Sequence, residues 1–311
     1  MAGEQKILVV GSINMDLVVR TRHMPDPGET VRGDKFIISP GGKGANQAVA
    51  AARLGAECRM IGRVGADTFG EQLLAGLKAE GIDCTDVTAT DEATTGVAMV
   101  IVDRMGENSI VVASGANATL RPDDLFARAE LFADADAVLL QLELPLPTVR
   151  AAIQLAKAHQ CRTVLDPAPA PKPMPADLCS VDILTPNVSE AQNITGKHAI
   201  EERIDKLVAS ELIGLGASAA VLKLGPRGSL VVMSDGHFYT VPAYKVEVVD
   251  TTAAGDAFTA ALTLAVSRGQ RLHEAARFAN AAGALACTKF GAFESMPTGD
   301  EVRMLMEDQP N

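Results

Sequence analysis

The chain has 311 residues, of which 47% are hydrophobic and 22% charged, a balance typical of a globular protein with one large domain or two ordinary ones. Its formal net charge of −11 repels nucleic acid and anionic lipid, so neither is expected as a partner. The 5 cysteines include no CxxC pair, which disfavours a disulfide scaffold or a zinc site and favours reduced thiols in a cytoplasmic protein. No apolar run approaches the roughly 18 residues of a membrane span.

Strand and helix patterns alternate along the chain, beginning with a buried apolar strand at residues 6–11. Strands are expected at 6–11, 16–22, 35–39, 59–64, 96–102, 108–113, 137–142, 163–166, 182–185, 219–223, 229–233 and 244–249. Helices are expected at 45–54, 68–80, 146–159, 201–215 and 258–266. This alternation predicts an α/β fold with a mostly parallel central sheet that helices cover on both faces.

Two β-rich stretches, residues 14–40 and 95–114, interrupt the early α/β rhythm. We expect them to pair into a small β-sheet lid outside the main sheet, suited to close over a ligand. The α/β domain then comprises residues 1–13, 41–94 and 115–311.

The sharpest chemical signal is Asp250-Thr251-Thr252-Ala253-Ala254-Gly255-Asp256, which follows the expected strand at 244–249 and opens an apolar helix. Small residues let a ligand approach the backbone, and free N–H groups at a helix start form an anion site that the helix dipole strengthens. Asp256 would lie where a phosphoryl acceptor arrives and would take its proton. The alternative role for Asp256 is to stabilise the helix N-terminus.

A second signal is Gly41-Gly42-Lys43-Gly44-Ala45-Asn46, which joins the first β-rich stretch to a helix. It is not a Walker A loop, because no Ser or Thr follows Gly-Lys, and Gln47 stands where a dinucleotide fingerprint needs its third glycine. The segment suits a polyhydroxylated ligand, to which Lys43 and Asn46 would supply hydrogen bonds. The alternative is an ordinary glycine-rich turn.

Two weaker signals follow in the second half of the chain. Asn187 and Glu190 share a helix face and are suited to hold a hydrated Mg²⁺ through its waters, or else they form a capping box. The loop from Lys223 to Gly228 is suited to lie over nucleotide phosphates, although turns of this kind are common.

Taken in order, these segments resemble the ribokinase family of carbohydrate kinases over nearly the whole chain. Residues 11–16 look like the family's opening strand and sugar-binding turn, and residues 41–48 and 250–258 are similar to its two signatures. Asn187 and Glu190 match its Asn-x-x-Glu element. The resemblance implies a central sheet wrapped by helices, with a β lid that also forms the contact of a homodimer.

The resemblance also implies ATP-dependent phosphorylation of D-ribose at the 5-hydroxyl. Asp256 would be the general base, and the backbone N–H groups of Ala253, Ala254 and Gly255 would form the anion hole for in-line transfer. The sugar would contact Asn14, Asp16, Gly42, Lys43, Asn46, Glu143 and Asp256. ATP would be bordered by Asn187, Lys223, Gly225, Gly228, Gly255 and Asn280.

Two cations follow from the same resemblance. Mg²⁺ would accompany ATP and be organised through water by Asn187 and Glu190. K⁺ would be held by the Asp250 carboxylate, the carbonyl groups of Thr252, Ala286, Lys289 and Gly291, and the Ser295 hydroxyl. Such an ion would fix the loop that presents the anion hole. The alternative role for Asp250 is to cap the following turn.

Three other functions stay open at this point. The chain is alternatively a kinase for 2-deoxyribose or a nucleoside such as adenosine, a sugar sensor without catalysis, or a nucleotide-dependent oxidoreductase. The intact Asp256, Asn187 and Glu190 disfavour the sensor, and the missing glycine fingerprint disfavours the oxidoreductase. Asn14 favours ribose, because a site built to bond a hydroxyl disfavours the analogue that lacks it.

Overall fold

The computed structural model describes residues 4–197 and 202–310, and its largest element is a nine-stranded sheet with the order β13-β12-β11-β10-β9-β8-β1-β4-β5. All neighbours from β11 through β5 pair in parallel, whereas β12 and β13 are antiparallel to their neighbours. The strands are β1 (Lys6–Val10), β4 (Glu57–Gly65), β5 (Asp83–Thr90), β8 (Ala137–Leu140), β9 (Arg162–Leu165), β10 (Ile183–Leu184), β11 (Ala219–Lys223), β12 (Ser229–Met233) and β13 (Phe238–Val241). The expected α/β fold is confirmed.

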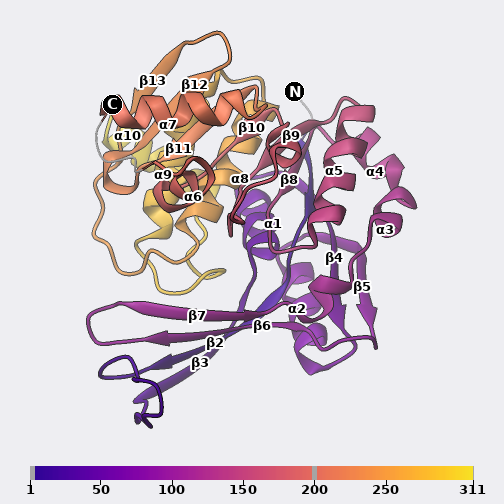
Figure 1. Ribbon diagram of the computed structural model, residues 1–311, viewed down its shortest axis with the longest axis vertical. Helices are drawn as coiled ribbons and strands as arrows, with labels where there is room; N and C mark the ends of the chain where they lie inside the picture. Colours follow the sequence, from indigo (N-terminus) through magenta and orange to yellow (C-terminus); the bar gives the residue numbers. More distant parts are fainter. Residues whose placement is uncertain (1–3, 198–201, 311) are drawn as a thin grey trace.

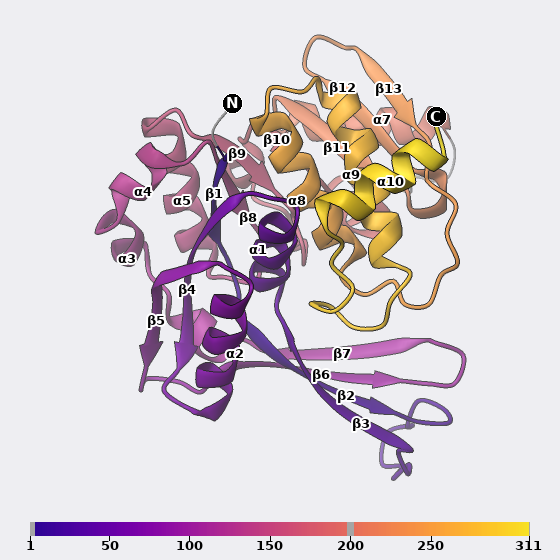
Figure 2. The same ribbon diagram turned by 180° about the vertical axis from the view of Figure 1, so that it is seen from behind.

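Helices cover both faces of this sheet, as Figures 1 and 2 show from opposite sides. Strand alternation divides the core: Ile7 and Val9 of β1 point into one apolar layer, while Leu8 and Val10 point into the other. The first layer lies under α1 (Lys43–Arg53), α2 (Thr68–Ala79), α8 (Ala254–Ser267), α9 (Leu272–Ala286) and α10 (Gly299–Asp308). The second lies under α3 (Pro122–Phe126), α4 (Ala129–Asp134), α5 (Leu146–Ala158), α6 (Val188–Thr195) and α7 (Glu202–Gly214).

A second, four-stranded sheet projects from the body (Figure 1) and has the order β3-β2-β6-β7. Its strands are β2 (Asn14–Arg20), β3 (Lys35–Gly41), β6 (Gly96–Val102) and β7 (Asn108–Ala113). The two β-rich stretches of the sequence therefore pair through β2 and β6, which run parallel from Asn14 opposite Gly96. We call this element the lid sheet; the division of the chain into two domains stays a prediction.

The strand expected at residues 244–249 is absent, and that prediction is wrong. Pro242 supplies no N–H donor directly after β13, and the segment from 242 to 248 has no regular structure. Val248 and Val249 are 61% and 60% exposed, and the Val249 N–H donates to the Cys287 carbonyl at 2.8 Å. The segment is thus an irregular connection pinned to the end of α9.

The other expected strands and helices are present with shifted ends. Glu201, where the helix at 201–215 was expected to begin, lies outside the described residues, and α7 accounts for the rest. The sequence patterns missed β5, β13, α3, α4, α9 and α10. β5 is threonine-rich and half-exposed at the sheet edge, so it carries no continuous apolar run. Across the described ranges, no helix is both long enough and apolar enough to cross a membrane.

Candidate active site

The site lies where the lid sheet joins the body, between the start of α1 and the start of α8. Gly42, the N-cap of α1, has a φ of 90°, which favours glycine, and a Cβ there would lie 2.7 Å from the Asn14 nitrogen. The backbone of the Gly-Gly-Lys-Gly segment therefore packs directly on the start of β2, where Asn14 lies. The glycine-rich segment 41–46 therefore lies in contact with residues 11–14.

Asp256 is 4% exposed and lies in the first turn of α8. Its Oδ2 accepts a hydrogen bond from Asn46 Nδ2 at 2.9 Å, and its Oδ1 accepts one from Gln47 Nε2 at 3.0 Å. Burial raises the pKa of Asp256, although nearby Lys43 and these two amides act in the opposite direction. The carboxylate is thus held in place and disposed to take a proton, as a general base requires.

The side-chain oxygen of Asn46 accepts no hydrogen bond from the described residues. Its Oδ1 is buried, and no described residue bonds to it. Because a buried carbonyl oxygen without a partner is costly, its position beside Asp256 favours a ligand hydroxyl there.

Three polar residues that the sequence patterns missed complete this network. Gln47 Nε2 also donates to Asp166 Oδ2 at 3.1 Å, and Gln141 Nε2 donates to Gln47 Oε1 at 2.6 Å. Asp166 Oδ1 in turn accepts from Lys223 Nζ at 2.9 Å. A usable signal existed for Asp166 alone, because it follows a buried strand, and ligands of α/β proteins bind at the carboxyl ends of strands.

The predicted sugar ligands Asp16, Lys43 and Glu143 lie near one another and near Asp256. Asp16 lies against Gly41, where a Cβ would be 2.3 Å from its carboxylate, and burial together with Glu143 and Asp256 raises the pKa of Asp16 to about 7. Burial alone would lower the pKa of Lys43, but Asp256, Asp166, Glu143 and Glu190 outweigh it and raise that pKa. Such a set of carboxylates around one ammonium suits a neutral, hydroxyl-rich ligand better than an anionic one.

Hydrogen bonds from neighbouring protein groups hold the side chains of both Glu143 and Asn14. Glu143 Oε2 accepts from Ser12 Oγ at 2.5 Å and from the Lys43 backbone N–H at 3.2 Å. Asn14 is 2% exposed, and its Oδ1 accepts from Asn117 Nδ2 at 2.8 Å. Ser12 and Asn117 are further residues without a sequence signal.

The start of α8 provides the proposed anion site. Its N-cap, Ala253, has a left-handed φ of 58°, and the Ala254 N–H donates only a long 3.3 Å hydrogen bond to the Thr251 carbonyl. The first N–H groups of a helix have no intrahelical acceptor and carry the positive end of its dipole. Lys223 Nζ lies 3.3 Å from the point where a Cβ on Gly255 would be, so an ammonium stands beside the same N–H groups.

Asn187 and Glu190 form the capping box of α6. The Asn187 side chain accepts from the Glu190 N–H at 2.8 Å, and both Asn187 nitrogens donate to the Glu190 carboxylate at 2.8 Å. Burial raises the pKa of Glu190, with Lys223 opposing the shift. Each carboxylate oxygen keeps a lone pair for a water, so the pair fits a hydrated Mg²⁺.

The remaining nucleotide candidates lie around the Lys223–Gly228 turn. Gly225 and Gly228 bound a short 3₁₀ turn between β11 and β12, as expected for this loop. A Cβ on Gly228 would be 2.1 Å from the Val241 carbonyl oxygen. Asn280 Nδ2 donates to the carbonyl groups of Val241 and Pro242 at 3.1 and 3.0 Å, so it ties α9 to the start of the irregular segment.

Asp250 joins the two segments predicted to hold K⁺. Its Oδ1 accepts from the Thr252 N–H at 2.9 Å, as the turn-capping alternative requires, and its Oδ2 accepts from the Gly291 N–H at 3.1 Å. The buried Ser295 hydroxyl bonds the Ala292 carbonyl at 2.9 Å, and Lys289 Nζ bonds Glu301 at 3.0 Å. Nowhere in the described ranges do three His, Cys, Asp or Glu side chains gather to hold a metal.

Comparison with solved structures places the fold in a class. The structure "of Arabidopsis thaliana Ribokinase complexed with Ribose and ATP" is 32% identical and has a TM-score of 0.90 over 98% of this chain and 99% of that chain. Together with the buried acid at the start of α8, this similarity defines the class as sugar kinases. Residues 4–299 match the pfkB family carbohydrate kinase profile, and the chain belongs to that family.

Curated relatives span the same length. The ribokinase of Haemophilus influenzae is 39% identical over 301 residues, which cover 97% of this chain and 98% of the relative. The deoxyribokinase of Salmonella typhi is 37% identical over 253 residues, or 81% of this chain and 82% of the relative. The comparisons thus include enzymes named for two different pentoses.

Proposed function

We propose that this protein transfers the γ-phosphoryl group of ATP to the 5-hydroxyl of D-ribose, giving ribose 5-phosphate and ADP. The observation that carries the proposal is the buried Asp256, held by Asn46 and Gln47 at the free N-terminus of α8 and opposite the pocket of Asp16 and Glu143. The names of the relatives at 32–39% identity support ribose and ATP as the substrates.

Positioning and charge stabilisation supply the catalysis. The sugar lies on Asn14, Asp16, Lys43 and Glu143, with its 5-hydroxyl toward Asp256. Asp256 takes the hydroxyl proton as the oxygen attacks the phosphorus in line. The backbone N–H groups of 253–255 and the Lys223 ammonium face the charge that develops on the transferred group. The lid sheet excludes water, which prevents wasteful hydrolysis.

Two cations complete the proposal. When bound, Mg²⁺ neutralises charge on the ATP phosphates, and Asn187 and Glu190 are placed to hold its waters. A monovalent ion, K⁺ by preference, would bind between the Asp250 and Gly291 segments and stiffen the loop before α8. The hydrogen bond from the Gly291 N–H to Asp250 supports this, because it already brings the two segments together.

A coupled ADP-release assay over a panel of sugars and nucleosides tests the function. We expect D-ribose to give the highest kcat/KM, and 2-deoxyribose to be at least about tenfold poorer, because it leaves the Asn14 amide unpaired in a buried site. Adenosine is expected to be inert as an acceptor. Equal kcat/KM for the two pentoses would contradict ribose as the preferred substrate, and no sugar-dependent ADP release would contradict kinase activity.

We also propose that two chains pair through their lid sheets. All residues of β7 are exposed, and Phe36, Met99 and Val111 on the lid sheet are 58%, 59% and 68% exposed. Pairing would bury this apolar face and protect the strand edges. Sedimentation velocity at micromolar concentration should show a dimer that Val111→Glu converts to monomer. Met304→Glu, at a residue 63% exposed on α10, is the matched control. A fully active wild-type monomer would contradict the pairing.

We also propose that the protein is cytoplasmic. All 5 cysteines are free thiols, and 4 of them are buried, which suits a reducing compartment. Recovery of the protein in a membrane or secreted fraction on cell fractionation would contradict this placement.

A further inference from the structure

Asn117 lies behind the sugar pocket, where the lid sheet leaves the body. It belongs to the short 3₁₀ helix η1 (Gly115–Thr119) and is 1% exposed. Its Oδ1 accepts from the Ile13 N–H at 2.9 Å, and its Nδ2 donates to the Ile13 carbonyl at 3.1 Å. The side chain therefore bonds both backbone groups of Ile13, as a neighbouring strand would. Because one of these groups is a donor and the other an acceptor, the orientation of the Asn117 amide is fixed.

The second hydrogen of Asn117 Nδ2 is then committed to Asn14. It donates to Asn14 Oδ1 at 2.8 Å, which turns the oxygen of Asn14 inward. Within the described part of the chain, Asn14 Nδ2 donates to no other residue, so the donor end of this amide is the end left for a ligand. Asn117 thus determines that the pocket offers a donor rather than an acceptor at Asn14.

Gly96 shows how tightly this pair is enclosed. It starts β6 opposite Asn14, and a Cβ on Gly96 would be 2.3 Å from both Asn117 Nδ2 and Asn14 Oδ1. Only a residue without a Cβ fits beside the hydrogen bond, so the root of the lid is shaped around it.

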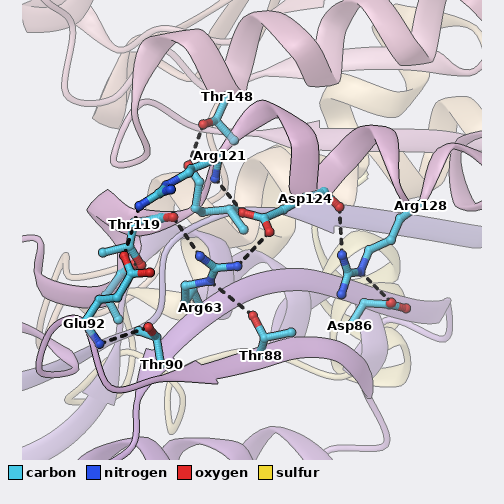
Figure 3. Close-up of polar contacts among 12 residues, drawn as sticks. Arg63, Asp86, Thr88, Thr90, Glu92, Thr119, Arg121, Asp124, Arg128 and Thr148 are labelled. Carbon is cyan, nitrogen blue, oxygen red and sulfur yellow. Dashed lines mark hydrogen bonds and ion pairs between the residues drawn. The ribbon is translucent and has the colours of Figure 1, made fainter.

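The η1 segment is itself anchored by an ionic and polar network. Figure 3 shows Arg63 between Thr119, Thr88 and Asp124, with hydrogen bonds of 2.7 Å to the Thr119 carbonyl and 3.2 Å to Thr88 Oγ1 and an ion pair of 2.8 Å to Asp124. Thr148 Oγ1 donates to the Leu120 carbonyl at 2.6 Å. These contacts hold η1 against β4 and α5 and leave Asn117 little freedom to move.

We infer that Asn117 is a positioning residue for sugar selectivity, which acts by fixing the Asn14 amide with its donor toward the 2-hydroxyl of the pentose. The inference rests on the proposed ribose kinase function. A ligand with a hydroxyl at this point satisfies Asn14 Nδ2, whereas 2-deoxyribose leaves it unpaired. Asn117 touches no substrate atom in this scheme and acts only through Asn14.

Asn117→Asp tests the inference. The new carboxylate oxygen would face and repel the oxygens of Asn14 and Ile13, so the hydrogen bonds that fix the Asn14 amide would be lost and this amide would be displaced from the 2-hydroxyl of the sugar. Isothermal titration of D-ribose and 2-deoxyribose into the full chain without ATP measures the ratio of the two Kd values. We expect the preference for ribose, about tenfold or more in wild type, to fall close to unity. In an Asn14→Ala background the same substitution should leave the ratio unchanged.

Two further variants separate selectivity from stability. Thr148→Val removes the bond to the Leu120 carbonyl in the same region without touching Asn14, so it should lower Tm and keep the ratio. Gly96→Ala forces Asn117 and Asn14 apart without removing either, and it serves in place of Asn117→Asp if that variant does not fold.

The outcomes distinguish the inference from the function on which it rests. A wild-type preference that survives in Asn117→Asp or Gly96→Ala overturns the inference alone. Equal binding of both pentoses by wild type also overturns it. Wild-type protein that binds neither pentose contradicts the proposed function instead.

Discussion

Asp256→Asn should lower kcat by roughly 10²–10⁴-fold, because it removes the group that takes the hydroxyl proton. The fold should tolerate the change. The new amide would meet the Asn46 amide, whose unpaired Oδ1 can turn to accept from it. Steady-state kinetics with ribose and ATP, together with titration of both ligands, measure turnover and binding separately.

Stability gives this prediction a second readout. Burial raises the pKa of Asp256 in the folded state. At any pH above the pKa that Asp256 has in the unfolded chain, this shift therefore lowers the free energy of unfolding. A neutral amide removes that penalty, and Tm at pH 8 should therefore be unchanged or higher. Asp182→Asn, in which the altered carboxylate accepts from Thr163 at the far end of the sheet, is the matched control and should keep full turnover. A near-wild-type kcat in Asp256→Asn would contradict the role of Asp256 as the general base.

Monovalent cations should activate the enzyme in an order set by ionic size, through Asp250. We expect K⁺ and Cs⁺ to exceed Na⁺ and a bulky organic cation at equal ionic strength. Asp250→Ala should abolish this dependence and lower kcat by about 10- to 100-fold, comparable at its upper end to the loss of one anion-hole donor. Sugar binding should be preserved, because Asp250 bonds the Thr252 and Gly291 backbone and not the sugar pocket.

A control with the same local chemistry is available. Asp235 bonds the backbone N–H two residues later at 3.0 Å, as Asp250 does, but it lies in the turn between β12 and β13. Asp235→Ala should retain both turnover and cation dependence. Equal rates in all four cations for wild type would rule out the monovalent site.

Part of the candidate site could be predicted from the sequence, because its backbone conformation and close packing require glycine and other small residues. Gly42 needs a positive φ against Asn14, and the small residues 253–255 open an apolar helix that begins with an acid. Local chemistry of this kind leaves a pattern within a few neighbouring positions. The strand–helix alternation predicted the parallel sheet for the same reason.

The rest depends on contacts between distant segments. Gln47 reaches Asp256 across 209 positions, and Asn117 reaches Asn14 across 103, so no spacing reveals either role. Residues 244–249 show the converse error, since an apolar β-type run forms no strand when no neighbouring strand pairs with it. Periodicity reports which face is apolar, but only the tertiary structure provides the partner.

The phosphorylated product tests the central claim most directly. Purified protein is incubated with ATP, Mg²⁺, K⁺ and D-ribose, and the sugar product is analysed by ³¹P–¹H correlation NMR alongside the ADP formed. The Asp256 and anion-site geometry predicts one phosphate on O5 of ribose for each ADP released. Phosphate on another oxygen, or ADP without a phosphorylated sugar, would contradict the account.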